Sequence, residues 1–502
     1  MATQTQDIER EFSRDEKSGI MHNEHAQNGL SQEDADFLNN FPDERKKTII
    51  RKVDWRLIPM LVLLYLIAYL DKTNIGNAKI EGMTVDLHLK GIEYNIVTAI
   101  FFIPFVLCEV PSNMILSRSR PSLFLPGIMI VWGCLSAVMS VSKNYSTILA
   151  FRFLLGCIES GFFPGVLYLL SSWYTRAELG KRFAIFYAAA VLSGAFGGLL
   201  AGGITSGMHD AHGITGWRWL FIIEGVATVG VGIIACFVLL DYPHNSKRLS
   251  PQERQLAQIR IVADGLASTS SLSGRLTHWQ AFVAAVSDPR TYIFIVLFML
   301  DVGAGTISYF IPTITKTLGY DSVEAQYMTV PIYAVATVVL IFVAWSSDRH
   351  IERRWHITSA LALGCIGSVV CAAVQNPIVR YVMICLVASG IWSALPLILS
   401  WASATVSLPP EKRAIVLALV NAFGNFSSVY GSRIWPTRDS PAYHIGFGVT
   451  AAFLGVGAIL ASVLPLLCKI TAHKGTAAER AVLAGLETEE RNGAGSEAAS
   501  AK

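Results

Sequence analysis

The segment RFLLGCIESGFFPGVLYLLSSWYTRAELGKR, residues 152–182, decides how this sequence folds. It is apolar over a length that crosses a bilayer, yet it contains Arg152 and Glu159. Seven residues, about two helical turns, separate these charges, so they share one helix face. A charge at membrane depth is costly and typically faces a protein interior or a water-filled path. The segment therefore predicts a membrane-spanning helix that lines a pore.

The composition of the chain points to many such spans. Of 502 residues, 52% are hydrophobic and 15% are charged, and the mean hydropathy is +0.46. A soluble protein carries about a quarter charged residues, so the deficit favours a polytopic membrane protein. The net charge of +3 gives no reason to expect a nucleic-acid partner. All eight cysteines fall inside apolar runs, which is typical of small buried side chains rather than disulfides or metal ligands.

Twelve apolar runs are long enough to span a bilayer. They lie at residues 57–79, 94–116, 122–142, 145–170, 183–206, 217–240, 290–314, 326–346, 356–375, 378–400, 413–434 and 445–468. We therefore expect an all-α polytopic membrane protein with twelve transmembrane helices in two six-helix halves. The expected domains are a disordered N-terminal tail (1–50), the first half (51–240), a linker (241–289), the second half (290–470) and a C-terminal tail (471–502).

Basic residues gather on one side of these spans. They occur in the N-terminal tail, after the second, fourth and eighth spans, in the linker and before the eleventh span. Because Lys and Arg favour the cytoplasmic face, both termini are expected to be cytoplasmic. In the linker, Ser250, Pro251 and Glu253 form a helix-start pattern, which predicts an amphipathic surface helix over residues 251–264. A plain connector between the halves is the alternative.

Two charged residues of the first half are expected at the same depth in the bilayer. A rise of about 1.5 Å per residue puts Asp71 and Arg152 at similar depths in the outer third of the bilayer. A carboxylate that alternates between binding a proton and pairing with an arginine can couple proton movement to transport. Asp71 and Arg152 are the first candidate for such a pair. Lys72 competes as a partner of Asp71, and a structural ion pair at the outer mouth explains the same residues equally well.

Three further carboxylates are candidates for proton coupling. Glu109 and Glu159 lie toward the cytoplasmic half, where they form either a proton relay or neutral carboxyl groups bonded to the backbone. Asp301 lies eleven residues into the seventh span, near the midplane, and is followed by Gly303 and Gly305. It is either a proton or substrate site or a group packed against a neighbouring hydroxyl.

Polar and aromatic side chains supply candidates for the wall of a substrate cavity. Asn421 and Asn425 share one face of the eleventh span, where they either bind a substrate or join helices by hydrogen bonds. The other candidates are Tyr65, Tyr69, Asn74, Tyr168 and Trp392. Tyrosine and tryptophan also anchor helices at membrane interfaces, which is the alternative for these aromatic residues.

The fifth span and the loops add three observations. Gly194, Gly198 and Gly202 are spaced four apart, which permits close approach of another helix and a smooth sliding surface. Asn144 begins an Asn-x-Ser sequence, a weak glycosylation candidate because it adjoins the membrane. The sequence has no phosphate-binding loop, metal-ligand cluster or nucleophile–base motif. We expect no enzyme activity, no cofactor and no metal, and a monomer.

Several of these stretches together resemble the major facilitator superfamily along residues 57–470. They are residues 69–78, 109–113, 152–164, 216–219, 224–225, 421–425 and 441–443. More closely they look like the fungal anion:cation symporter group, the relatives of allantoate and nicotinate permeases. The resemblance implies a proton-driven secondary transporter of small organic acids or vitamins. Arg152 and Gly156 match the superfamily's fourth-helix Arg-x-x-x-Gly motif, which is implicated in proton coupling.

The resemblance also implies a gate. The superfamily's Gly-x-x-x-Asp-Arg motif survives loosely in the second half as Asp348 and Arg349, followed by Arg353. The corresponding first-half segment, residues 117–121, lacks the aspartate. The proline that drug antiporters carry in the fifth helix is also missing, which weighs against drug export.

These features predict proton-coupled uptake of a small organic anion, a carboxylate or a vitamin such as nicotinate, by alternating access at the plasma membrane. The partners would be the anion, protons and the lipid bilayer. Two alternatives stay open: an exporter of a secondary metabolite, and a nutrient sensor that does not transport. Sensors usually carry long signalling tails, and the tails of this chain are short and plain.

Overall fold

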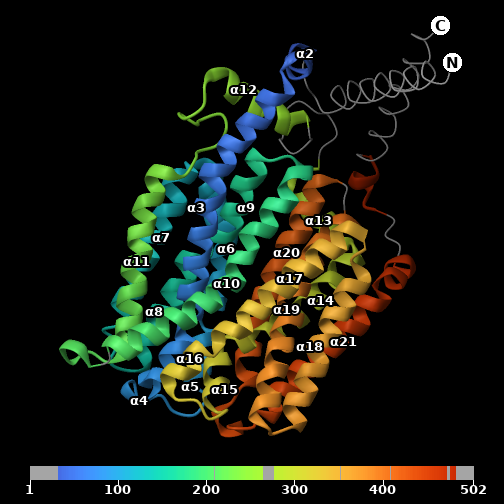
Figure 1. The fold of residues 1–502 in the computed structure, drawn as a ribbon. Helices are drawn as coiled ribbons and strands as arrows, with labels where there is room; N and C mark the ends of the chain where they lie inside the picture. Colours follow the sequence, from blue (N-terminus) through green and yellow to red (C-terminus); the bar gives the residue numbers. More distant parts are fainter. Residues whose placement is uncertain are drawn as a thin grey trace, which may run out of the picture.

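The computed structural model describes residues 32–208, 210–263, 276–350, 352–406, 409–471 and 475–481. Every regular element in these residues is a helix (Figure 1). Eleven helical stretches of the described chain are long and apolar enough to cross a membrane. The all-helical fold expected from the sequence is therefore confirmed.

The helices form two halves joined by a linker. The N-terminal half contains α3 (Asp43–Ala78), η1 (Lys79–Met83), α4 (Thr84–Asp86), α5 (Glu93–Ala99), α6 (Phe102–Arg118), α7 (Pro121–Met139), α8 (Tyr145–Glu159), α9 (Phe162–Trp173), α10 (Arg176–Met208), η2 (Ala211–Gly213) and α11 (Gly216–Val238). The C-terminal half contains α14 (Pro289–Gly305), η3 (Thr306–Tyr309), α15 (Ile311–Lys316), α16 (Ser322–Tyr327), α17 (Thr329–His350), α18 (Arg354–Ala373), α19 (Pro377–Thr405), α20 (Pro410–Gly431), η4 (Ser432–Ile434), η5 (Thr437–Asp439) and α21 (His444–Ile470). Helix α2 (Gln32–Asn40) precedes the first half, and α12 (Pro251–Ala263) and α13 (His278–Ser287) lie in the linker.

The second expected span has no counterpart among these eleven stretches, because a break divides it into two helices. Helix α5 ends at Ala99 and α6 begins at Phe102, so the break covers residues 100–101. Pro104 explains this position, because proline has no N–H to donate and its ring crowds the carbonyl group four residues earlier. The break between α8 and α9 has the same spacing from Pro164. The expected span at 94–116 is thus present as two shorter helices.

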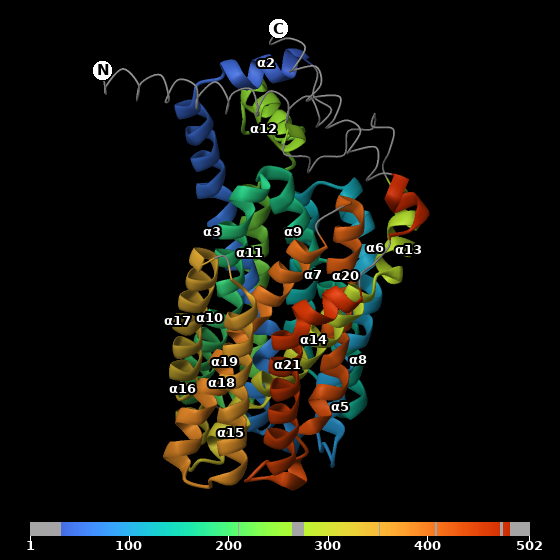
Figure 2. The same cartoon turned by 90° about the vertical axis from the view of Figure 1, so that its right-hand side faces the viewer.

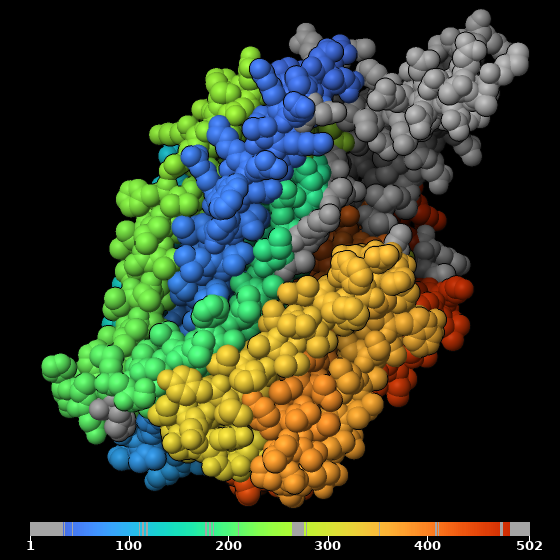
Figure 3. Space-filling model, in the orientation of Figure 1, coloured from blue at the N-terminus to red at the C-terminus, as the bar shows by residue number. Residues whose placement is uncertain are grey.

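The two halves meet closely along the glycine face of α10. A side chain at Gly198 would collide with Thr329 and with the backbone carbonyl of Gln326, and Gly194 faces the ring of Tyr333. Helix α10 therefore approaches α16 and α17 of the other half nearly backbone to backbone, as the glycine spacing indicates. Figure 3 shows the resulting boundary as a diagonal between the green and the yellow surfaces.

The described chain begins and ends at the same end of the bundle, here called the tail end; the opposite end is the far end. Helices α2 and α12 lie at the tail end, beyond the bundle (Figure 2). The sequence predicted disorder up to residue 50, but residues 32–40 and 43–50 are helical. Leu38 and Ile49 pack against Leu256 and Ile259 of α12, and this shared apolar cluster is what orders the segment. Residues 1–31 lie outside the described residues.

Helix α12 forms where the linker sequence predicts a helix. The backbone N–H of Glu253 donates to the Ser250 hydroxyl at 3.3 Å, and the N–H of Ser250 donates to the Glu253 carboxylate at 2.7 Å. This reciprocal pair satisfies N–H groups that a helix start leaves without partners. Arg260 then pairs with Glu178 of α10 at 2.5 Å, so α12 is attached to the N-terminal half.

Candidate functional site

Two adjoining cavities lie between the halves at mid-depth. The first has about 700 Å³ of space, part of it open to solvent, and is lined by Tyr65, Ala68, Tyr69, Lys72, Phe105, Glu159, Phe162, Phe163, Tyr187, Phe298, Val302, Leu395, Leu399, Asn421 and Asn425. The second has about 390 Å³ and is lined by Tyr69, Lys72, Phe102, Val302, Gly305, Thr306, Ser308, Tyr309, Ile391, Trp392, Leu395, Asn425 and Ser428. The lining positions on α14, α19 and α20 place the first nearer the tail end and the second nearer the far end. We call them the tail-side and far-side cavities.

Lys72 lies at the junction of the two cavities and lines both. Its ammonium nitrogen is 4.6 Å from the ring centroid of Phe105, 5.0 Å from that of Phe102 and 5.3 Å from that of Phe101. Among the residues that the structure describes, the ammonium group forms no ion pair. Faces of aromatic rings attract a cation by about 0.5–2 kcal/mol each, less than the several kcal/mol that desolvating an ammonium group costs. Lys72 is thus a buried ammonium group that has no carboxylate at ion-pair distance among the described residues, although the carboxyl groups of Glu159 and Glu109 lie within electrostatic reach.

Asp71, the neighbouring residue, points away from the cavities into the N-terminal half. Its Oδ2 atom accepts hydrogen bonds from Trp132 Nε1 at 3.0 Å and from Thr228 Oγ1 at 2.9 Å. The expected pairing of Asp71 with Arg152 is absent from the structure, because the donors to Asp71 come from α7 and α11. Equal depth did not establish that the two side chains face each other.

Arg152 is completely buried, and none of its side-chain nitrogens is hydrogen-bonded within the described residues. Its guanidinium carbon is 4.9 Å from the ring centroid of Phe101, the ring that Lys72 also contacts. Glu159, two turns further along the fourth span, lines the tail-side cavity and lies within electrostatic reach of Arg152, Lys72 and Asp71. Arg152, Glu159 and Lys72 therefore form one charged group around the junction, with Arg152 behind the cavity wall.

Glu109 connects the halves through the asparagine pair. Its Oε1 atom accepts a hydrogen bond from Asn421 Nδ2 at 3.0 Å, across from α6 to α20. Asn425 Nδ2 in turn donates to the Asn421 backbone oxygen at 3.0 Å. Both asparagines line the tail-side cavity. The two roles considered for them, wall of a cavity and hydrogen-bond link between helices, thus occur together.

Asp301 is buried in α14, and both of its carboxylate oxygens lack a hydrogen-bond partner among the described residues. It lines neither cavity, although Phe298 and Val302 of the same helix do. It lies within electrostatic reach of Tyr187, which belongs to the other half and lines the tail-side cavity. The expected packing against Thr306 or Ser308 is not found, since both hydroxyls donate to backbone oxygens of their own helix.

The other cavity candidates divide into two groups. Tyr65, Tyr69 and Trp392 line the cavities. Asn74 is buried outside them, with neither side-chain polar atom bonded to a described residue. Tyr168 does not line a cavity, contrary to expectation. It is 46% exposed on the outside of the bundle, and its ring packs edge-on against that of Tyr242, with 5.6 Å between the centroids.

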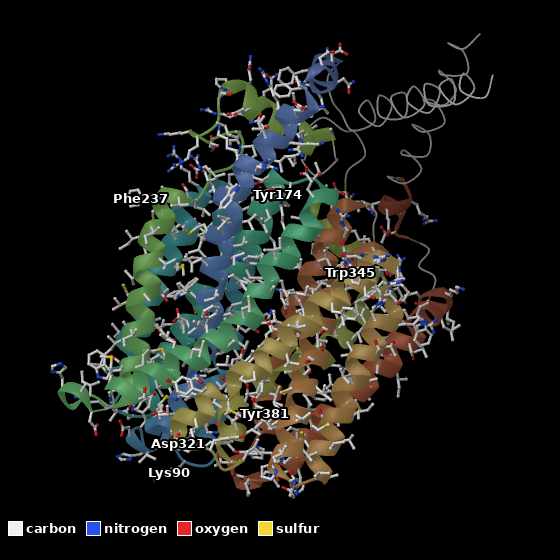
Figure 4. The ribbon with its side chains drawn as sticks, in the orientation of Figure 1. Lys90, Tyr174, Phe237, Asp321, Trp345 and Tyr381 are labelled. Carbon is white, nitrogen blue, oxygen red and sulfur yellow. The ribbon has the colours of Figure 1, made fainter. Side chains whose placement is uncertain are left out.

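The gate and glycosylation candidates lie near the helix ends. Asp348 and Arg349 are exposed at the end of α17, with Arg349 over the ring of Trp345, whose position Figure 4 shows. Arg353 donates to the backbone oxygen of Ser400 at 3.4 Å, which ties this loop to α19 of its own half. Asn144 caps α8, since its side-chain oxygen accepts from the Thr147 N–H at 3.0 Å.

At the far end, which Lys90 and Asp321 mark in Figure 4, polar contacts join the halves directly. Asn95 Nδ2 of α5 donates to the backbone oxygens of Ser432 at 2.5 Å and Trp435 at 3.1 Å. Gln326 of α16 donates to Glu81 at 2.6 Å. These contacts tie the two halves together at the far end.

Sequence reasoning missed several residues that shape this site. Lys72 was noted only as a competitor for Asp71, although a lysine inside an apolar span is itself a functional signal. Glu224, buried on α11 one turn before Thr228, adds a carboxyl group beside Asp71. The aromatic wall carries no signal of its own, because phenylalanine in a span also faces lipid. Among the described residues, no group of three or more histidine, cysteine, aspartate or glutamate side chains could hold a metal ion.

Two helical halves with adjoining cavities and buried charges between them are typical of a membrane transporter. The sequence profile of the Major Facilitator Superfamily matches residues 61–432. The chain belongs to this superfamily, so it is a multi-pass membrane protein from a family of transporters of small molecules.

Curated relatives cover most of the chain. It is 35% identical over 439 residues to the MFS-type transporter cnsO of Penicillium expansum, covering 85% of this chain and 84% of that protein. It is 33% identical over 421 residues to the major facilitator-type transporter hxnP of Emericella nidulans, covering 82% and 84%. A bacterial homologue of the human lysosomal transporter Spinster, solved inward-facing and unoccupied, has a TM-score of 0.65 at 16% identity, covering 84% of this chain and 97% of that one. The xylose transporter XylE from E. coli has a TM-score of 0.59 at 15% identity, covering 85% and 99%. These two structures share the fold.

Proposed function

We propose that the protein takes up a small organic anion together with protons, by alternating access across the plasma membrane, with both termini in the cytoplasm. The observation that carries the proposal is the Lys72 ammonium group at the junction of the two cavities. A buried charge that no carboxylate contacts directly is costly, and the carboxylate of a bound substrate would supply that contact. The anion:cation symporter group, expected from the sequence motifs, belongs to the same proposal.

Proton coupling would act through Glu159. This carboxyl group lines the cavity that the anion would occupy, within electrostatic reach of Lys72. An ionised Glu159 would repel a substrate carboxylate and compete for Lys72, whereas a protonated Glu159 would do neither. Anion binding and protonation of Glu159 then favour each other, which is the thermodynamic requirement for symport. Glu109, Asp71 and Asp301 are further proposed proton sites, and Arg152 would stabilise the anion from behind the wall.

The test is uptake of labelled nicotinate and other small carboxylates by cells that express the chain, at external pH 5 and pH 7. Acid-stimulated accumulation that a protonophore abolishes supports proton symport. Lys72→Met should reduce uptake at least tenfold at equal surface expression, Lys72→Arg should retain part of it, and Lys90→Met in an exposed loop serves as control. Wild-type uptake by Lys72→Met would refute the proposed anion site.

A second variant separates coupling from binding. Glu159→Gln mimics the protonated carboxyl group, so it should still exchange labelled for unlabelled substrate but lose acid stimulation. Acid stimulation that survives in Glu159→Gln would assign coupling to another carboxyl group. Faster loss of label from preloaded cells, without uptake, would show export instead of import.

A further inference from the structure

The linings of the two cavities differ in chemistry, and the difference specifies the ligand more closely. The tail-side cavity is walled by seven aromatic side chains: Tyr65, Tyr69, Phe105, Phe162, Phe163, Tyr187 and Phe298. The far-side cavity has fewer aromatic side chains, those of Tyr69, Phe102, Tyr309 and Trp392, and also gathers the hydroxyl and amide groups of Thr306, Ser308, Ser428 and Asn425. Within both linings Lys72 is the one cationic side chain.

The aromatic wall is a connected, packed surface. Tyr65 stacks on Phe186 behind it, with 4.2 Å between ring centroids, and contacts Phe163 at 5.7 Å and Tyr69 at 5.9 Å. Phe163 also lies 6.2 Å from Phe186. Rings held in this way present their faces and edges at fixed positions, which favours a flat aromatic guest over a saturated one of equal size.

Three polar side chains of the far-side cavity can accept hydrogen bonds from a ligand. Thr306 donates its hydroxyl proton to the Gly303 backbone oxygen at 2.7 Å, and Ser308 donates to that of Gly305 at 2.8 Å. The Asn425 amide group donates to Asn421 at 3.0 Å. The hydroxyl protons of Thr306 and Ser308 are thus used on backbone oxygens of α14, and the oxygens of all three side chains keep lone pairs that can accept from a ligand. A neutral O–H or N–H donor on the ligand fits this lining.

We propose that the ligand is an aromatic monocarboxylic acid that bears a hydroxyl or amine-type N–H donor beside the carboxylate. Its ring occupies the tail-side cavity, its carboxylate pairs with Lys72 at the junction, and the donor group enters the far-side cavity. A second carboxylate would find no cation in either lining, so dicarboxylates bind more weakly. This inference rests on the proposed transport of an organic anion and adds the identity of its chemical class.

Binding to the purified full-length protein tests the ligand class without transport. Dissociation constants come from ligand titrations of the apparent unfolding temperature with phenylacetate, cyclohexylacetate, mandelate and succinate. Cyclohexylacetate is at least as hydrophobic as phenylacetate, so only ring chemistry makes phenylacetate bind more tightly, by about 2- to 10-fold. Mandelate, which adds one hydroxyl beside the carboxylate, should bind about 2- to 10-fold more tightly than phenylacetate. Succinate should bind most weakly.

Two variants assign each preference to its cavity. Phe163→Leu should abolish the preference for phenylacetate over cyclohexylacetate while leaving the mandelate advantage. Thr306→Val, which replaces the hydroxyl by a methyl group of similar size, should abolish the mandelate advantage while leaving the ring preference. Unchanged ratios in both variants would overturn the assignment, even if both variants fold as the wild type does.

The outcomes distinguish this inference from the function it rests on. If the acids bind but phenylacetate and cyclohexylacetate bind equally, the aromatic class is refuted while uptake of organic anions stands. If none of the acids binds and none is transported at either pH, the proposed function fails as well. Wild-type affinity of Lys72→Met for phenylacetate would likewise refute the placement of the carboxylate at the junction.

Discussion

At the tail end of the C-terminal half, a buried ion cluster offers a quantitative test of how this half is held together. The Lys412 ammonium group is fully buried, 2.8 Å from Asp288 and 2.7 Å from Glu479 of the C-terminal tail. Asp288, also fully buried, caps α14 and pairs with Arg290 at 2.6 Å. The cluster thus joins the start of α14, the start of α20 and the C-terminal tail.

Asp288→Asn should destabilise the protein by about 2.5 kcal/mol. Burial by itself raises the pKa of Asp288, but hydrogen bonds and the charges of Arg290 and Lys412 outweigh it and lower the pKa to about 2, from 3.8. A shift of nearly two units corresponds to about 2.5 kcal/mol of folding free energy. Removing one partner of a buried ion pair costs about 3–5 kcal/mol in other proteins, which is of the same order.

The sign of the effect fixes its pH dependence. Because the folded-state pKa is depressed, the stabilisation is fully present above the unfolded-state pKa of about 4 and is lost as pH falls toward 2. The difference in unfolding free energy between wild type and Asp288→Asn should therefore be constant from pH 7 to pH 5 and shrink below pH 4. The measurement is unfolding of the purified proteins in denaturant at each pH, with Asp36→Asn, an exposed carboxylate of α2, as control. A loss below about 0.5 kcal/mol, or one that persists unchanged at pH 3, would refute this reasoning.

Two further predictions concern the contact between the halves and the tail-end cluster. Gly198→Leu should reduce transport at least tenfold at normal surface expression, because any side chain there meets the Gln326 carbonyl. The control Gly203→Leu places its side chain in open space and should transport normally. Equal transport by both variants would contradict the close approach of α10. Leu256→Asp places a charge in the apolar cluster that α12 shares with α2. It should accelerate tryptic cleavage within residues 45–52 about tenfold. The control Gln258→Asp, on the exposed face of α12, should leave the cleavage rate unchanged. Unchanged cleavage would show that α12 does not hold α2 in place.

Most of the fold could be predicted from the sequence, because the length of each apolar run and the low fraction of charged residues are strong signals of membrane-spanning helices. The exception at the second span is local as well: Pro104 lies inside the apolar run, and its effect four residues earlier splits the helix into α5 and α6. The order of the N-terminal segment was not readable. Leu38 and Ile49 bury their side chains against α12, which lies some 200 residues further along the chain, and a polar composition does not reveal such a contact.

The site was only partly readable for a geometric reason. Rise per residue gives the depth of a side chain but not the direction in which it points, so Asp71 and Arg152 matched in depth and still face different neighbours. Asn421 and Asn425 line the same cavity because i and i+4 positions share a face whatever the rotation of the helix. Lys72 was undervalued because its counterparts are aromatic faces from α6 and from Phe101 just before it, which no charge pattern reveals.

The two halves contribute different chemistry to the cavities, and this separation has consequences for how they work. The charged side chains in the linings, Lys72 and Glu159, both come from the N-terminal half, with Arg152 and Asp71 behind them. The C-terminal half lines the same space with apolar, hydroxyl and amide groups. Under the proposed function, rocking of one half against the other then moves neutral groups past a fixed set of charges, so that no ion pair between the halves has to break within the cavity. Coupling, pairing with the ligand carboxylate and most of the aromatic wall would belong to the N-terminal half, and the hydroxyl groups of the far-side cavity to the C-terminal half, with the Glu109–Asn421 hydrogen bond as a polar link between them at mid-depth. A neutral hydrogen bond of this kind costs only about 1 kcal/mol to break, and a charged one about 1.5–3 kcal/mol, so the protonation state of Glu109 sets how readily the halves separate there.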